Sequence, residues 1–312
     1  MQNPTGGHIE AGRFVVDSYA EALLNPNHYW GYGHMWLACM ETTLFVVAGI
    51  SAWNILQQRH EILFRKCFKL ALIGLLVATP LQVLVGDIAG LYLFDIQPAK
   101  TAAIEGHWET NPPGQGADWH VLAWPNKTRQ ANDWAISIPN ALSFIATHKM
   151  DGQVKGLKEF PPEDQPPALP LIFYTFRLMV GIGMAMLALV LASGFFCWKN
   201  RALPHGPTIP AWLLRGWVAF IPLGYLATEC GWIVREVGRQ PWAVYGLLRT
   251  EHAASHLPAP AVVTSLVLFA LIYSLLLLTF IVFARRIIVT GPNIDEPLPA
   301  LQFPVRAHKP RG

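Results

Sequence analysis

The chain has little charge. Asp, Glu, Lys and Arg make up 14% of its 312 residues, while hydrophobic residues make up 53%. Soluble domains carry about 25% charged residues, so this composition argues against a soluble domain and favours a polytopic helical membrane protein. The basic residues gather between the apolar runs, where they act as topology signals. A nucleic-acid partner is therefore not expected.

Cysteine is also scarce, and the four that occur have no CxxC spacing: Cys39, Cys67, Cys197 and Cys230. Neither a disulfide framework nor a cysteine metal site is indicated. The N-terminal stretch MQNPTGGHIEAG is polar, and it has no apolar core of the kind that a secretory signal requires.

Five long apolar runs predict five membrane spans, at about 29–56, 70–88, 169–198, 211–237 and 261–284. Basic clusters follow the first, third and fifth runs, so those ends are expected in the cytoplasm. We therefore predict an all-α, polytopic transmembrane helix bundle with a long external loop. Its parts would be residues 1–90 with two spans, the loop 91–168, residues 169–290 with three spans, and a cytoplasmic tail 291–312.

The long loop is too long for a simple turn, so it is expected to be functional or disordered. Its many tryptophans favour a folded loop, and residues 133–148 predict a short amphipathic helix interrupted near Pro139. Lys100 and Glu105 lie at its start. A Lys and a Glu near a membrane surface can bind and deprotonate a quinol; solvated surface charges are the alternative interpretation.

The fourth span carries two carboxylic acids. Glu229 and Glu236 are seven residues apart, about two turns, and so share one face. An acid at membrane depth is costly and needs a cationic or polar partner, which leaves open a metal, a buried arginine or a proton path. Trp232 lies one turn before Glu236 on that face, with interfacial anchoring as its alternative role. Gly238 is expected to cap the helix.

A histidine and a methionine lie in the outer halves of two other spans. His34 in the first and Met179 in the third would hold a haem iron from both sides, if those helices face each other. Taken singly, each has an ordinary alternative, as a hydrogen-bonded helix histidine or a packing methionine. Arg177 points to a different face from Met179, and it suits a haem propionate, a carboxylate or the membrane interface. Arg239 is equally ambiguous. Glu41 shares a face with His34. It has two possible roles: it lines a proton path, or it stays protonated and hydrogen-bonds a neighbouring helix.

Several motifs resemble subunit I of the cytochrome bd-type quinol oxidases, including the cyanide-insensitive group. They occur in the family's order along most of the chain: LNP at 24–26, His34, GISAW at 49–53, Gly86-Asp87, KTAAIEGHWET at 100–110, FRLMV at 176–180, ECGW at 229–232 and GRQPW at 238–242. GRQPW and KTAAIE are the most specific of these motifs.

The resemblance implies roles for particular residues. His34 and Met179 match the axial ligands of a low-spin haem b, and Glu236 matches the carboxylate ligand of a high-spin haem b. Three more residues match positions near the haems: Trp232, Arg177 and Arg239. Lys100 and Glu105 match the quinol-site pair of a loop of the short kind.

The implied activity is oxidation of ubiquinol at the external loop, with electrons passing through the haems to haem d, where oxygen is reduced to water. Subunit II would be the partner, in a bacterial inner membrane. Family members have four more spans before the first one here, so the chain resembles the C-terminal part of subunit I. Glu41 also departs from the family's pattern, in which no acid is expected at that position. The alternatives are an inactive fragment or haem-binding remnant, and a proton-coupled transporter that uses Glu41 and Glu229.

Overall fold

The computed structural model describes residues 2–11, 13–200, 209–255 and 257–291. It divides the chain into two compact units, Met1–Ala254 and Ser255–Gly312. Among the described residues, five helical segments are long and apolar enough to cross a membrane. The predicted number of spans and the all-α fold class are therefore confirmed, because the strands form only two-stranded sheets in the described part of the chain.

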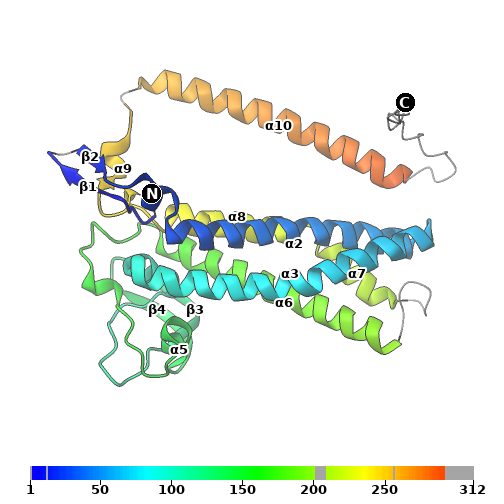
Figure 1. Ribbon diagram of the computed structural model, residues 1–312, viewed down its shortest axis with the longest axis horizontal. Coiled ribbons are helices and arrows are strands. Elements are labelled where there is room, and N and C mark those ends of the chain that lie inside the picture. Colours follow the sequence, from blue (N-terminus) through cyan, green and yellow to red (C-terminus); the bar gives the residue numbers. More distant parts are fainter. Residues whose placement is uncertain (1, 12, 201–208, 256, 292–312) are drawn as a thin grey trace, which may run out of the picture. The chain divides into compact units, whose positions relative to one another are not determined.

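The first unit is built on helices α2 (Pro26–Leu56), α3 (Glu61–Ile96), α6 (Leu169–Asn200), α7 (Ala211–Ala219) and α8 (Leu223–Val237), with the loop segments at one end of the bundle (Figure 1). The Asn25 side chain caps α2 by accepting a hydrogen bond from the Asn27 amide at 2.9 Å. Helix α3 is longer than predicted. Its first turn includes charged residues, and Arg65 pairs there with Glu61 at 2.8 Å.

The fourth span is not the single helix that the apolar run 211–237 predicts. Helix α7 ends at Ala219 and α8 begins at Leu223. Pro222 has no N–H to donate to the preceding turn, which explains the break. Gly238 is the C-cap of α8, as predicted.

An apolar core joins α2, α3, α6 and α7 at the end away from the loop. The buried Trp217 ring lies 4.9 Å from the Phe45 ring and 5.3 Å from the Phe68 ring, between centroids. Its indole N–H donates to Ser193 Oγ at 2.9 Å. A buried indole usually finds such a partner, so this contact ties α6 to α7.

The loop is folded, as its tryptophans indicated, but one predicted element was wrong. Its elements are α4 (Pro98–Glu105), β3 (Trp119–Asn126), β4 (Ala131–Ile138), α5 (Ala141–Thr147) and the short 3-10 helix Leu157–Glu159. The predicted helix at 133–148 is a strand up to Ile138 and a helix only from Ala141. Trp134, Ile136 and Ile138 alternate with smaller residues, a period-two pattern that favours a strand. That strand pairs antiparallel with β3, from Trp119 opposite Ile138 to Asn126 opposite Ala131.

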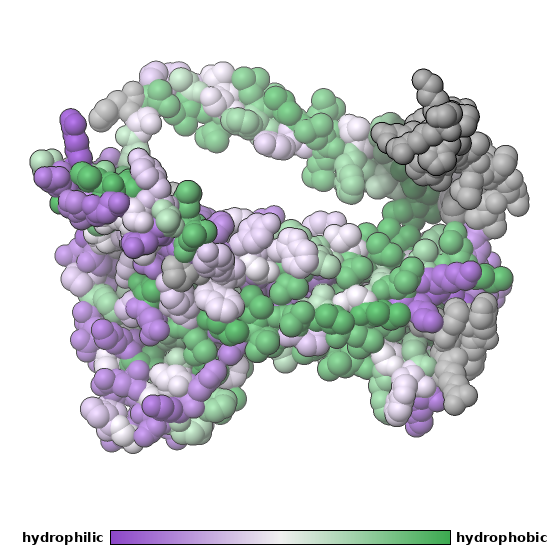
Figure 2. All heavy atoms as spheres, viewed as in Figure 1, coloured by the Kyte–Doolittle hydropathy of each residue, from purple (hydrophilic) through white to green (hydrophobic). Residues whose placement is uncertain are grey.

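Short elements complete the first unit. The polar N-terminal stretch forms a hairpin of β1 (Gly7–Glu10) and β2 (Arg13–Val16), followed by α1 (Tyr19–Leu23). After α8, the chain forms β5 (Trp242–Val244), β6 (Leu248–Arg249) and α9 (Thr250–Ala253). Figure 2 shows apolar side chains gathered along the membrane-length helices and hydrophilic ones over the loop.

The second unit contains α10 (Ala259–Thr290), which is longer than the predicted span 261–284 and includes Arg285 and Arg286. None of the residues of α10 is buried. The predicted tail lies outside the described residues except for Gly291, and so does Arg201, which belongs to the basic cluster predicted after the third span.

Candidate functional site

His34 projects from α2 toward α3. A Cβ atom built on Gly86 of α3 would lie 3.1 Å from His34 Cε1 and 3.4 Å from Nδ1. Nδ1 is buried and has no hydrogen-bond partner among the residues that the structure describes. A buried polar atom without a partner calls for a ligand, a water or a special role. The interpretation as an ordinary hydrogen-bonded helix histidine gains no support from Nδ1.

Met179 has a matching environment on α6. A Cβ atom on Gly231 of α8 would lie 3.1 Å from Met179 Sδ. Each predicted axial ligand thus lies against a glycine of a neighbouring helix. An imidazole nitrogen and a thioether sulfur are the donors of six-coordinate, electron-transferring haems, so the residues fit the implied group. The ligand roles themselves stay predictions.

Glu236 pairs with Arg239. The guanidinium donates to Glu236 Oε2 at 2.9 Å from Nε, and Nη2 lies 2.8 Å from the same oxygen. Arg239 also donates to the carbonyls of Trp242 and Ala243, at 2.9 and 2.8 Å. The sequence left three possible partners for the acids of this span: a metal, a buried arginine or a proton path. The structure shows an arginine as the partner of Glu236. The GRQPW turn is folded around that arginine.

The other residues of this face are exposed within the described protein. Trp232 is 44% exposed, and Glu229 is exposed as well. Glu41 on α2 is buried instead, at 5% exposure. Groups of three or more His, Cys, Asp or Glu that could hold a metal ion are absent from the described residues; a haem iron held by single side chains needs no such group.

Lys100 and Glu105 of the KTAAIE motif both lie on α4, and both are buried. Lys100 is 4% exposed and Glu105 is 3% exposed. The alternative interpretation, solvated surface charges, is therefore wrong. The helix ends at Gly106, whose φ of 60° lies in the left-handed region and suits a glycine C-cap. A Cβ there would also lie 3.3 Å from the Phe173 ring.

Lys100 lies against the C-terminal end of α8. Its Nζ donates to the Arg235 carbonyl at 3.1 Å and to Gln2 Oε1 at 3.4 Å. Burial lowers the pKa of Lys100 from 10.5 to about 7; the positive charges of Arg235 and Arg239 act in the same direction, and Glu236 opposes them. Burial disfavours the charged form of a lysine, and this lysine lies close to the Glu236–Arg239 pair.

Gln2 is a site residue that the sequence did not reveal. It is 6% exposed, it donates to the Arg235 carbonyl at 3.2 Å, and its Oε1 accepts from Gln97 at 3.0 Å as well as from Lys100. It lies 98 residues before Lys100, in a polar stretch without periodicity. Nothing local in the sequence points to this contact.

Glu105 faces a different element. It lies five positions after Lys100 on α4, which places the two about 140° apart around the helix. Glu105 Oε2 pairs with Arg177 Nη2 of α6 at 2.8 Å. The sequence left a haem propionate, a carboxylate or the membrane interface as possible partners of Arg177. The structure shows the carboxylate. The structure places the predicted quinol-site pair on one buried helix, with each member bonded to a different span.

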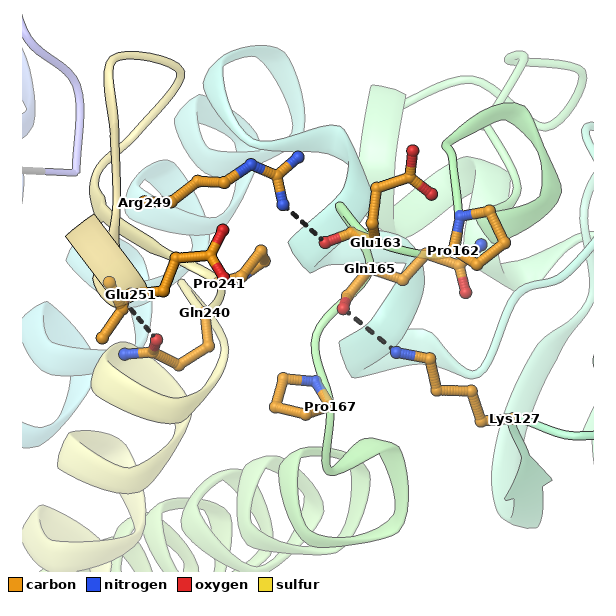
Figure 3. A pocket seen from close by; sticks show the side chains of 10 residues that line it. Lys127, Pro162, Glu163, Gln165, Pro167, Gln240, Pro241, Arg249 and Glu251 are labelled. Carbon is orange, nitrogen blue, oxygen red and sulfur yellow. Dashed lines mark hydrogen bonds between the residues drawn. The ribbon is translucent and has the colours of Figure 1, made fainter.

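An open pocket of about 470 Å³ lies nearby, between the loop and the turn after α8. Figure 3 shows Arg249 donating to the Glu163 carbonyl at 3.2 Å and Lys127 donating to the Gln165 carbonyl at 3.2 Å. Gln240 and Pro241 of GRQPW line it, but none of the predicted ligand or quinol-site residues does. Because no residue of α4 lines it, this pocket is separate from Lys100 and Glu105.

Known proteins are similar to this chain in both sequence and fold. A family model described as cytochrome bd terminal oxidase subunit I matches residues 1–292. The chain is 33% identical over 298 residues to cytochrome bd ubiquinol oxidase subunit 1 of Bacillus subtilis, a match that covers 92% of this chain and 62% of that protein. It is 26% identical over 359 residues to cytochrome bd-II ubiquinol oxidase subunit 1 of Escherichia coli, covering 94% and 68%.

The fold is also similar to a solved structure. The bd oxidase of Geobacillus thermodenitrificans matches with a TM-score of 0.80 and 31% identity, over 93% of this chain and 65% of that chain. The chain thus spans a little under two thirds of the length of the Bacillus subtilis relative and of this structure.

Proposed function

Because the chain belongs to the cytochrome bd terminal oxidase subunit I family, we propose that it oxidises a quinol at its external loop and carries electrons toward oxygen reduction. It is a multi-pass membrane protein. It would work in a bacterial inner membrane, in a complex with subunit II. Ubiquinol would be the substrate, as the names of two relatives suggest.

One observation carries the proposal: buried α4 is bonded to α6 and α8, two of the three helices that hold predicted haem ligands. Lys100 donates to the carbonyl of Arg235, which directly precedes Glu236 on α8. Glu105 pairs with Arg177, two residues before Met179 on α6. A quinol bound at α4 would therefore lie beside the route that its electrons must take.

The residues present would divide the work as follows. His34 and Met179 would hold a low-spin haem b, Glu236 a high-spin haem b, and haem d would complete the set; when bound, these groups supply one-electron carriers and the oxygen-reducing centre. Trp232, Arg177 and Arg239 would lie near them. Two chain residues act on the substrate side: Glu105 accepts a proton from the quinol hydroxyl, and Lys100 orients the quinol oxygen.

The pKa of Lys100, lowered to about 7 by burial, lets this side chain hold or release a proton near neutral pH. Protons taken from the quinol would leave on the loop side of the membrane. Charge separation then needs no pump, provided that the protons used to form water come from the opposite side.

The Glu105→Ala variant of the complete oxidase tests this function. Loss of a general base typically slows a reaction by about 100-fold or more, so quinol oxidation should fall while the haem absorption spectrum stays unchanged. Glu109→Ala is the matched control, because the Glu109 side chain is 73% exposed and pairs with Lys158. Normal turnover in Glu105→Ala would remove this residue from the quinol site.

The absorption spectrum of the purified chain separates the remaining alternatives. Reduced-minus-oxidised bands of haem b are expected if His34 and Met179 bind iron. A spectrum without haem bands would instead favour a proton-coupled transporter that uses Glu41 and Glu229. Haem bands without quinol oxidation by the complete oxidase would indicate a haem-binding remnant.

A further inference from the structure

The guanidinium of Arg177 is held by acceptors from two other elements of the loop. Its Nη2 donates to Glu105 Oε2 at 2.8 Å and to the His120 carbonyl at 2.7 Å; Nε donates to the same carbonyl at 3.2 Å, and Nη1 donates to the Ile104 carbonyl at 2.9 Å. The Arg177 side chain is 12% exposed and that of Glu105 is 4% exposed. Arg177 therefore fastens α4 and β3 to the outer part of α6.

Aromatic rings enclose the same guanidinium. Its Cζ lies 4.0 Å from the centroid of the Phe173 ring, 5.7 Å from that of Trp119 and 5.9 Å from that of Phe176. Such rings attract a cation, and together with the hydrogen bonds they restrict the guanidinium plane to one orientation. The carboxylate of Glu105 is thereby given a fixed position as well.

The charged and titratable groups around Glu105 come from three directions. Arg177 faces it from α6. The backbone carbonyl of His120 on β3 accepts from the arginine, and the His120 ring is bonded to Ser137 Oγ at 2.7 Å. His107, just after the end of α4, has its Nε2 3.3 Å from the Val154 carbonyl. Burial lowers the pKa of both histidines, so in neutral solution Arg177 is the cation that balances Glu105.

We propose that Arg177 is the positioning residue of the quinol site: it orients Glu105 and holds it as an ionised base, instead of serving chiefly as a partner for a haem propionate. This inference rests on the proposed function. A guanidinium has about five N–H donors. Four hydrogen bonds already join this one to Glu105, Ile104 and His120, which leaves little donor capacity for a propionate.

The pair also accounts for how the base is restored after each turnover. Oxidation of a quinol breaks two O–H bonds, one after the other. Each time, the proton forms a new O–H bond on Glu105, and one electron leaves to the haem iron that the proposed function supplies as oxidant. Arg177 is then a buried cation without a counter-charge, a costly state. Loss of the proton from Glu105 restores the ion pair, so the burial of Arg177 favours deprotonation of Glu105 after each transfer.

Two variants of Arg177 in the complete oxidase test the inference, with ubiquinol-1 as substrate. In Arg177→Met, Glu105 becomes a buried carboxylate without a cation, and burial then favours the protonated acid. The acidic limb of the kcat/KM profile should move to higher pH by about one unit or more, with the haem spectrum retained. Arg177→Lys keeps the positive charge but loses the planar fork of donors. Its pH profile should therefore be close to that of the unchanged protein, while its KM for ubiquinol-1 should be higher because Glu105 is less well oriented.

Arg249→Met is the matched control. Arg249 also pairs with a carboxylate, Asp164, and donates to the Glu163 carbonyl, but it lines the separate open pocket. Its acidic limb should match that of the unchanged protein. An equal displacement in Arg249→Met would show a general effect of losing an arginine, and would overturn the assignment to Arg177.

The outcomes separate the two proposals. An unchanged pH profile in Arg177→Met, with Glu105→Ala slow, would overturn the positioning role and leave the quinol site standing. Normal turnover in Glu105→Ala would overturn the quinol site itself. If Arg177→Met does not assemble with haem, Arg177→Lys decides, because an unchanged KM in that variant would show that the guanidinium geometry has no role.

Discussion

Gly231 of α8 lies directly against the thioether of Met179 on α6: a Cβ atom at Gly231 would lie 3.1 Å from Sδ. That distance is shorter than an ordinary van der Waals contact between these atoms. The sulfur can remain in place only because residue 231 has no side chain. The ECGW motif therefore affects the predicted iron ligand on the neighbouring helix as well as the acids on its own.

The Gly231→Ala variant should displace the Met179 sulfur by a few tenths of an ångström or more. We expect a weakened or shifted low-spin haem signal in the reduced-minus-oxidised spectrum of the complete oxidase, because the axial ligand sets the electronic state of the iron. Gly216→Ala is the control, since the added Cβ would lie 3.6 Å from Leu189 Cδ1, an ordinary contact. Identical spectra for both variants would contradict the prediction.

Met179→Leu should remove the low-spin haem signal or convert it to a high-spin one. Leucine has a similar volume but no sulfur to coordinate iron, so packing is largely retained. Met184→Leu on the same helix serves as the comparison, because Met184 is 51% exposed. If Met179→Leu leaves the spectrum unchanged, Met179 is a packing residue.

Lys100 should make stability depend on pH. Its pKa is about 7 in the folded protein, against an ordinary value of 10.5, mainly because of burial. Between these two pH values the unfolded chain binds a proton that the folded chain has lost, so the free energy of unfolding rises as the pH increases from about 7 to about 10.5. In Lys100→Met this rise should be smaller.

Thermal unfolding at pH 7, 8 and 9 in detergent measures that effect. Lys158→Met is the control, because the Lys158 side chain is 39% exposed and pairs with Glu109 at the surface. Equal pH slopes for the unchanged protein and for Lys100→Met would show that Lys100 keeps its proton in the folded state.

Ser193→Ala should destabilise the core by about 1–3 kcal/mol, because the buried indole N–H of Trp217 would lose its acceptor. Chemical or thermal unfolding of the complete oxidase reports the change. Thr175→Ala is a control on the same helix, since the Thr175 hydroxyl bonds to a carbonyl one turn earlier on α6 and leaves no orphaned donor. A loss below about 0.5 kcal/mol would mean that a water replaces the hydroxyl.

The spans could be read from the sequence because hydropathy is local: a run of apolar residues needs no knowledge of its neighbours to be recognised as a membrane segment. The break at Pro222 and the strand at Ala131–Ile138 were missed. A proline in an apolar run does not always interrupt a helix, and a strand depends on a partner such as β3. The ordered motifs carried the family and its predicted ligands.

The sequence by itself determined the membrane class, the number of spans and the residues that can supply donors to iron or bases to a quinol. Only the tertiary structure decided which of them meet. Glu105 and Arg177 are 72 residues apart, and Gln2 and Lys100 are 98 apart. Ion pairs and hydrogen bonds act over a few ångströms, so chain segments this distant become partners only when packing of the helices brings them together.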